Sequence, residues 1–181
     1  MRKTIILVLS FFCCFCVSAQ IKNVTIQASG LTCSMCSNAI FKSLQTLEEV
    51  DSITPNIKTS SFIIVFKSGS SINFDRLKKK VENAGFFVAR MDVQMAIDTL
   101  SLYNDVHIER NGFLFHFVHV TEQTLRNEIN FRIIDKGYLT TKESKRFAAY
   151  TSMPCYATGL TEACCVHIQQ PLGTRIYHAT L

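Results

Sequence analysis

The sequence predicts an α+β fold, with a βαββαβ unit over residues 20–91 and a small β-rich domain over residues 92–181. Two observations carry this prediction. Before residue 91, stretches of alternating apolar residues are interrupted by two stretches whose apolar residues recur every three or four positions. After residue 91, strand and turn signals dominate, with one short helix signal. The length of 181 residues fits one domain or two small ones.

The first 19 residues have the features of a secretory signal peptide. Arg2 and Lys3 precede an apolar run from Ile5 to Val17, and Ala19 provides a small residue for cleavage. The run is too short to span a bilayer as a helix, although an uncleaved anchor is the alternative. We therefore expect an exported protein, periplasmic or secreted, without stable membrane insertion after cleavage. It would keep five cysteines: Cys33, Cys36, Cys155, Cys164 and Cys165.

The elements of residues 20–91 follow from apolar spacing. Strands are expected around Val24–Ile26 and over 50–57, 62–66 and 86–89. A first helix is expected from Cys36, and a second carries a stripe that Gly85 closes. The stripe residues of the two helices are Ile40, Leu44, Leu47, Phe74, Leu77, Val81 and Ala84. Strand, helix, strand, strand, helix, strand is the order of the ferredoxin-like unit, which places both helices on one face of an antiparallel sheet.

Three motifs in this unit carry a family resemblance. They are Gly30-Leu31-Thr32-Cys33-x-x-Cys36, Leu44-x-x-Leu47-x-x-Val50 and Ala84-Gly85-Phe86. On these motifs, residues 22–90 resemble the heavy-metal-associated domain, the family of copper chaperones and of soluble modules on metal-pumping ATPases. Leu31 replaces the family's Met, and Phe86 replaces its Tyr. The resemblance implies a metal site at Cys33 and Cys36.

Thiolate chemistry fits this implication. Two cysteines three residues apart, one before a helix and one in its first turn, can converge on one ion, and the helix N-terminus favours thiolate. Soft sulfur ligands favour Cu(I), with Hg(II) and Ag(I) as other soft ions, whereas Zn(II) prefers four ligands. A thioredoxin-type redox pair and a disulfide are the alternatives, but Trp is absent from the chain and Ser34-Met35 separates the cysteines.

These features predict an exported protein that binds Cu(I) and passes or buffers it by thiolate exchange. Its partner would be a metal-handling protein with exposed thiols, such as a transporter or metal ATPase. A mercury scavenger of the same family and a secreted interaction module with oxidised cysteines are the alternatives. We expect no enzymatic activity. The net charge of +5 is too small to indicate nucleic-acid binding.

Residues 92–181 resemble no family that we recognise. A linker is expected over 92–106, and Asn111-Gly112 predicts a hairpin between 106–110 and 113–120. A further strand is expected around Ile129–Ile133, and Thr140-x-x-Glu143 predicts a capped helix through Tyr150. Final strands are expected over 163–169 and 175–181.

Histidines and cysteines in this half offer further ligands. On one strand, His116 and His119 would point to opposite faces, so we expect packing roles for both. If residues 163–169 form a strand, Cys164 faces the core, where it could pair with Cys155 in a disulfide. Cys165 and His167 would share the other face as a second metal site. A disulfide, a metal site and buried thiols are the open alternatives.

Overall fold

The structure is a computed structural model that describes residues 20–31 and 34–181. The predicted signal peptide and Cys33 therefore lie outside the described residues. The described elements are β1 (Ile21–Ser29), α1 (Ser34–Gln45), β2 (Val50–Asn56), β3 (Ser61–Phe66), α2 (Phe74–Asn83), β4 (Phe87–Leu102), β5 (Val106–Arg110), β6 (Phe113–Phe117), β7 (Gln123–Ile133), α3 (Thr141–Ala148), α4 (Cys155–Thr158), η1 (Ala163–Cys165) and β8 (Ile176–Thr180).

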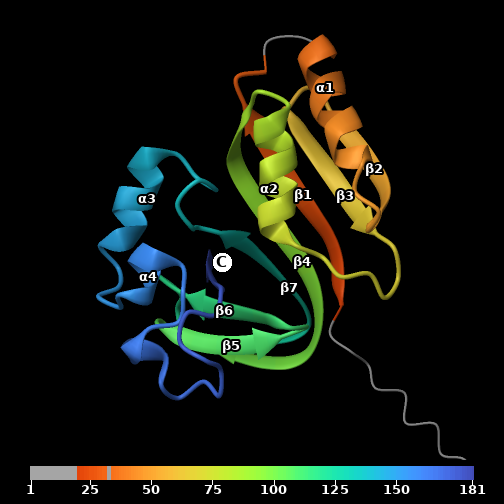
Figure 1. The fold of residues 1–181 in the computed structure, drawn as a ribbon. Helices are drawn as coiled ribbons and strands as arrows, with labels where there is room; N and C mark the ends of the chain where they lie inside the picture. The colour runs from red at the N-terminus through yellow and green to blue at the C-terminus, as the bar shows by residue number, and fades with distance from the viewer. Residues whose placement is uncertain (1–19, 32–33) are drawn as a thin grey trace, which may run out of the picture.

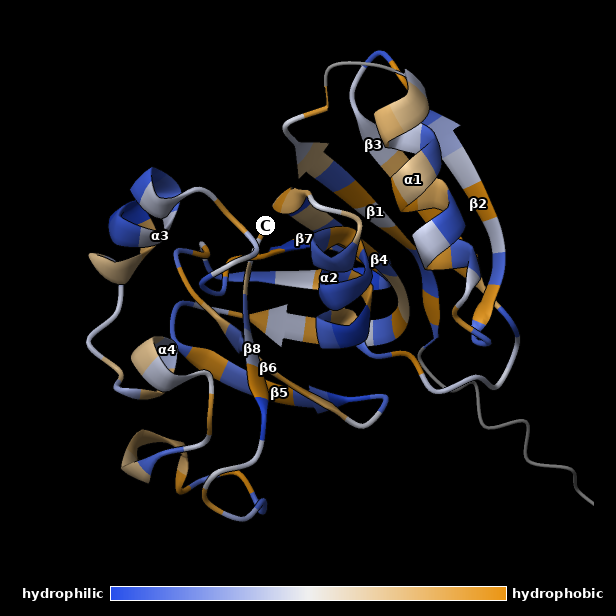
Figure 2. Cartoon of the chain, turned by 45° about the horizontal axis from the view of Figure 1, so that its top comes forward, coloured by the Kyte–Doolittle hydropathy of each residue, from blue (hydrophilic) through white to orange (hydrophobic). Residues whose placement is uncertain are grey.

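The βαββαβ unit is confirmed. Its strands are antiparallel in the order β2-β3-β1-β4, and α1 and α2 lie side by side over one face (Figure 1). Helix α2 begins where the Asn73 side chain accepts a hydrogen bond from the backbone N–H of Arg76 at 2.9 Å. Leu77 and Val81, predicted to be buried, are fully buried. The outer face of α2 is hydrophilic (Figure 2).

Strand β4 is longer than the sequence analysis predicted. It continues through residues 92–102, so the prediction of a linker over 92–106 was wrong. One edge of β4 pairs with β1, and the other pairs with β7 from Met91 to Leu102. Met91, Val93, Met95 and Ile97 are all buried, an alternation that favours a strand. The division into two domains stays a prediction, and the strand runs through the expected boundary at residue 91.

The second half extends the same sheet to the order β2-β3-β1-β4-β7-β8-β6-β5 over the described residues. The β5–β6 hairpin is confirmed, with φ of 56° at Asn111 and 74° at Gly112, as a tight hairpin turn requires. Helix α3 is confirmed, and the predicted Thr140–Glu143 capping box is present. The strand predicted around Ile129–Ile133 is β7, and the last predicted strand is β8.

The strand predicted over residues 163–169 was wrong. Residues Ala163–Cys165 form a short 3₁₀ helix, in which the backbone N–H of Cys165 donates to the carbonyl of Glu162 at 2.9 Å. The backbone N–H of Ile168 donates in turn to the carbonyl of Cys165 at 3.0 Å, which continues the turn. Side chains here therefore do not alternate between two faces of a sheet.

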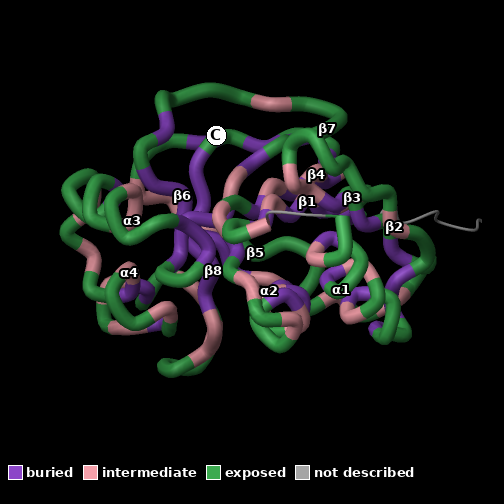
Figure 3. The backbone as a smooth tube through the Cα atoms, turned by 90° about the horizontal axis from the view of Figure 1, so that it is seen from above, coloured by how far each residue is buried: buried purple, intermediate pink, exposed green. Residues whose placement is uncertain are grey.

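The two halves share one hydrophobic core, which extends along the sheet from Ile21 to Ala179. At the start of α2, the Phe74 ring stacks on Phe113 with centroids 4.7 Å apart and meets the Tyr177 ring edge-on at 5.1 Å. Buried backbone is prominent in β6 and β8, while the outer loops are exposed (Figure 3). The first half thus packs directly against the second.

Asp75, in the first turn of α2, adds polar contacts between the halves. Its carboxylate accepts hydrogen bonds from the hydroxyls of Tyr138 at 2.6 Å and Tyr177 at 2.8 Å. It also accepts from Arg175 Nε at 3.0 Å. Within residues 20–31 and 34–181, no helix is long and apolar enough to cross a membrane.

Candidate functional sites

The first candidate site is the Cys-x-x-Cys motif at the start of α1. Cys36 is the third residue of this helix and is half-buried, while Cys33 lies outside the described residues. The first turn of α1 contains no acidic side chain. Cys36 therefore lies near the positive end of the helix dipole, which favours an anionic sulfur ligand, without a neighbouring carboxylate in that turn.

The residues around Cys36 separate a packed side from an exposed one. Ser37 and Ile40 are buried, and Leu31 packs against the main core. Met35 is 81% exposed, so the side chain between the two cysteines faces solvent. The start of α1 is therefore exposed to solvent at Met35, while the face of the helix that carries Ile40 packs against the core.

Gly30 and Phe86 connect two of the sequence motifs in space. Gly30 has a φ of 85°, a left-handed conformation that favours glycine. A Cβ atom built at this position would lie 3.8 Å from Cδ1 of Phe86. Phe86 therefore lies beside the loop that leads into the Cys-x-x-Cys motif, and it also packs against the core.

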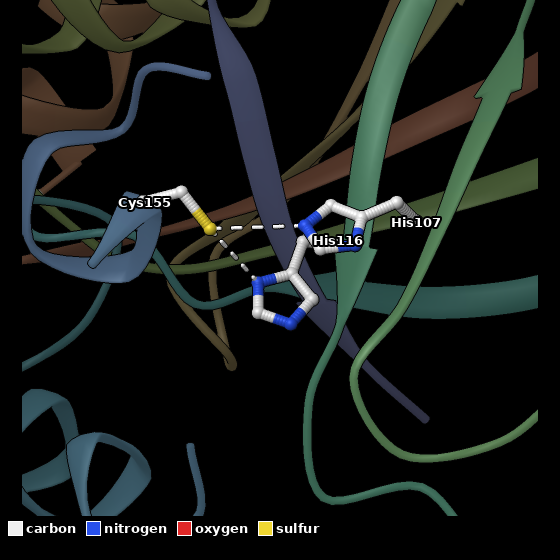
Figure 4. Close-up of side chains that lie close together, drawn as sticks. All are labelled: His107, His116 and Cys155. Carbon is white, nitrogen blue, oxygen red and sulfur yellow. Dashed lines mark hydrogen bonds between the residues drawn. The ribbon is translucent and has the colours of Figure 1, made fainter. Parts of the chain in front are cut away.

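The second candidate site is a cluster of sulfur and imidazole groups in the other half. Cys155 begins α4, and its Sγ lies 3.7 Å from His107 Nε2 and 3.6 Å from His116 Nδ1 (Figure 4). Cys165 Sγ lies 3.5 Å from the same His107 Nε2. The Sγ atom of Cys164 is 3.6 Å from that of Cys165. Two groups with convergent ligand atoms, His107–His116–Cys155 and Cys155–Cys164–Cys165, thus share Cys155.

The β5–β6 hairpin brings the two histidines together. Its two-residue turn pairs His107 directly with His116, and the two rings stack with centroids 4.3 Å apart. Fixed register therefore holds both imidazoles on the same face of the sheet. His116 is fully buried, and its Nε2 donates to Asp105 Oδ1 at 3.0 Å, which orients Nδ1 toward Cys155.

Burial sets the protonation of these groups. Burial, reinforced by neighbouring histidines, lowers the pKa of both His107 and His116 to about 4, so both rings are neutral at pH 7. Burial also raises the pKa of the Cys155 and Cys165 thiols. Without an ion, the cluster is therefore a set of neutral imidazoles and thiols.

Cys165 lies in this cluster. His167 was predicted to share one face of a strand with Cys165, but residues 163–169 do not form that strand. His167 is exposed, and its ring meets the His107 ring edge-on with centroids 5.0 Å apart. Cys155, Cys164 and Cys165 are present as thiols, so the Cys155–Cys164 disulfide, one of the three alternatives, is not formed. His119 lies beyond β6 with a φ of 61°, and its ring stacks on Tyr150 at 3.7 Å.

His107 was not predicted to be a ligand from the sequence. The signal was available, because the Asn111-Gly112 turn fixes the hairpin register and places His107 opposite His116. The approach of Cys155 and Cys165 to that pair depends on the path of residues 155–175, which is irregular apart from two short helical turns. Only the folded chain reveals that contact.

The first half of the chain is similar to known proteins. Residues 25–87 match the family model described as "Heavy-metal-associated domain". A probable copper-exporting P-type ATPase of Archaeoglobus fulgidus is 32% identical over 73 residues, which are 40% of this chain but 9% of the ATPase. The expected family resemblance is thus confirmed for this segment, and the chain spans less than one tenth of that relative.

Several solved structures are also similar to part of the chain. The yeast copper transporter domain Ccc2a is 26% identical and covers 36% of this chain and 88% of its own, with a TM-score of 0.33. Oxidized MerP from Ralstonia metallidurans CH34 is 23% identical and covers 39% and 96%, with a TM-score of 0.35. A putative copper-ion-binding protein from Bacillus anthracis is 24% identical and covers 39% and 99%, with a TM-score of 0.35.

Proposed function

We propose that this chain is an exported metal-binding protein that holds Cu(I) between Cys33 and Cys36 and passes or buffers it by thiolate exchange. One observation carries the proposal: a Cys-x-x-Cys motif opens the first helix of a βαββαβ unit whose residues match the heavy-metal-associated domain. The 32% identity to a probable copper-exporting ATPase supports copper as the metal. The role is binding and transfer rather than catalysis.

The surroundings of the motif support transfer. Two thiolates suffice for a soft monovalent ion, and they leave room for a third thiolate from another protein. Cys36 is half-buried next to exposed Met35, so an incoming thiol can approach from solvent. We propose that the partner is a metal-handling protein with accessible thiols, such as a transporter or metal ATPase.

Export is proposed from the first 19 residues. The Arg2-Lys3 start, the apolar run and Ala19 together indicate a cleaved signal peptide. Expression of the full chain in a bacterium, followed by fractionation and mass measurement, tests this. A periplasmic product that begins at Gln20 supports export, and a full-length product in the cytoplasm contradicts it.

Cu(I) titration of reduced residues 20–181 against a competing chelator tests the metal site. The Cys33→Ser/Cys36→Ser variant should lose one equivalent of tightly bound Cu(I). Ser34→Ala is the matched control, because it changes the same loop but keeps both thiols. Retention of every equivalent in the double variant would contradict the proposed site. Parallel titrations with Hg(II), Ag(I) and Zn(II) compare the other metals, and failure of the reduced protein to bind any would favour an interaction module.

A further inference from the structure

We propose that His107, His116, Cys155 and Cys165 form a second metal site, which holds a tetrahedral d¹⁰ ion, Zn²⁺ or Cu⁺, independently of Cys33 and Cys36. The site would join the β5–β6 hairpin to the irregular segment that contains α4 and η1. This proposal does not depend on the function proposed for the Cys-x-x-Cys motif.

The separations between the ligand atoms fit one shared ion. Zinc binds sulfur at about 2.3 Å and nitrogen at about 2.0 Å, so the sulfur–nitrogen edge of a tetrahedral site is about 3.6 Å. The three sulfur–nitrogen separations in the cluster are 3.7, 3.6 and 3.5 Å. The ligand atoms of His107, His116 and Cys155 all lie within 4.8 Å of one another, as do those of Cys155 and Cys165. An ion therefore fits between His107, His116 and Cys155, and Cys165 approaches two of these three ligands, His107 and Cys155.

Hydrogen bonding alone accounts less well for this arrangement. The Sγ atoms of Cys155 and Cys165 both face His107 Nε2, yet one imidazole nitrogen accepts or donates only one well-directed hydrogen bond. Among the described residues, His107 Nδ1 has no hydrogen-bond partner, so the polar contacts of this ring are concentrated at Nε2. A metal ion bound to Nε2 and both sulfur atoms would satisfy all three groups.

The surroundings of the cluster are those of a closed metal site. Asp105 orients His116, and such an outer carboxylate is common behind histidine ligands. His116 and Cys155 are fully buried, and Cys165 is nearly so. Four protein ligands in a buried setting retain an ion, in contrast to two thiolates at an exposed helix end. The second ion would therefore stabilise the protein rather than be passed to a partner.

The experiment uses residues 20–181 carrying Cys33→Ser/Cys36→Ser, so that the first motif contributes no metal. The reduced protein is titrated anaerobically with Co²⁺ as a spectroscopic probe and then with Zn²⁺ or Cu⁺. We expect one equivalent of Co²⁺ with the absorption of tetrahedral cobalt bound to thiolate, and stoichiometric displacement by at least one of the other ions. Absence of a bound equivalent would overturn the proposal.

Cys164 supplies a matched control, because its thiol converges with those of Cys155 and Cys165 but does not belong to the convergent group that contains the two histidines. Cys164→Ser should keep the cobalt spectrum, whereas Cys155→Ser and Cys165→Ser should each lose the bound equivalent or one sulfur–cobalt band. Circular dichroism verifies that each variant is folded. If a variant does not fold, the cobalt absorption spectrum of the Cys33→Ser/Cys36→Ser protein still tests the site. Loss of the spectrum in Cys164→Ser, with its retention in Cys165→Ser, would refute the assigned ligands.

Discussion

Replacement of Asp75 by Ala should destabilise both halves of the protein together. The Tyr138 side chain is only 1% exposed, and its hydroxyl donates to Asp75 at 2.6 Å. Removal of the acceptor leaves this buried donor unsatisfied, at a cost of about 1–3 kcal/mol. The ion pair with Arg175 adds at most about 1 kcal/mol, because the Asp75 side chain is 47% exposed and solvent screens the pair. We therefore expect a loss of about 2–3 kcal/mol in the free energy of unfolding.

Urea unfolding measures this loss directly. With a slope of about 2 kcal/mol per molar urea, the midpoint should fall by about 1–1.5 M. Tyr103→Phe is the control, since Tyr103 is 53% exposed, and it should shift the free energy of unfolding by less than about 0.5 kcal/mol. Hydrogen exchange should show equal losses of protection in β1 and β8 if the halves unfold together. Unchanged protection in either strand would refute this coupling.

The effect of Asp75 should also depend on pH. Burial alone would raise the pKa of Asp75, but hydrogen bonds from Arg175, Tyr138 and Tyr177 outweigh burial and lower it. A carboxyl with a lowered folded-state pKa contributes stability above its unfolded pKa of about 3.9, and that stability disappears as pH falls through the folded pKa. The difference between wild type and Asp75→Ala should therefore be full at pH 6 and shrink below pH 4. A constant difference would contradict this assignment.

Three further predictions concern other parts of the structure. Asp105→Asn should weaken Zn²⁺ or Co²⁺ binding at the proposed second site about 10–100-fold, because an outer carboxylate is lost. Asn tolerates the φ of 62° at this position, so the backbone should not change. Unchanged affinity in the Cys33→Ser/Cys36→Ser background would contradict the prediction. Thr140→Ala should cost about 1 kcal/mol in urea unfolding, since it removes the capping box of α3, and a neutral result would show that the cap contributes little. Phe74→Ala should cost about 3–5 kcal/mol, because the fully buried ring packs between the halves; a loss below about 1 kcal/mol in thermal or urea unfolding would exclude that role.

Local sequence patterns predicted the elements whose stability is mainly local. The stripe of α2, the Thr140–Glu143 capping box and the Asn111-Gly112 turn each combine a residue pattern with a short-range physical cause. Strand β4 was predicted too short because residues 92–106, which have few turn or helix signals, were interpreted as a linker. The alternation of Val93, Met95 and Ile97 was present in the sequence and favoured a longer strand.

The second cluster was only partly predictable. Cys165 was selected as a ligand candidate and lies beside His107 in the cluster, but a strand over 163–169 was inferred from a short apolar pattern that also fits a turn. Contacts between residues far apart in sequence, such as Cys155 with His107, depend on how the chain crosses the sheet after α3. Hairpin register would have predicted the His107–His116 pair, whereas no local signal places the cysteines beside it.

The long strand β4 also has a consequence for solubility. The part of β4 beyond residue 91 pairs on one edge with β1 from Ile21 to Thr25, and β7 covers its other edge as far as Leu102. The open edges of the whole sheet are β2, which contains Pro55, and β5, which ends in Glu109 and Arg110. Proline and charged residues discourage the addition of a strand from another molecule. A fragment cut at residue 91 would lose this part of β4 and leave the edge of β1 unpaired from Ile21 to Thr25, where a strand of another molecule could add.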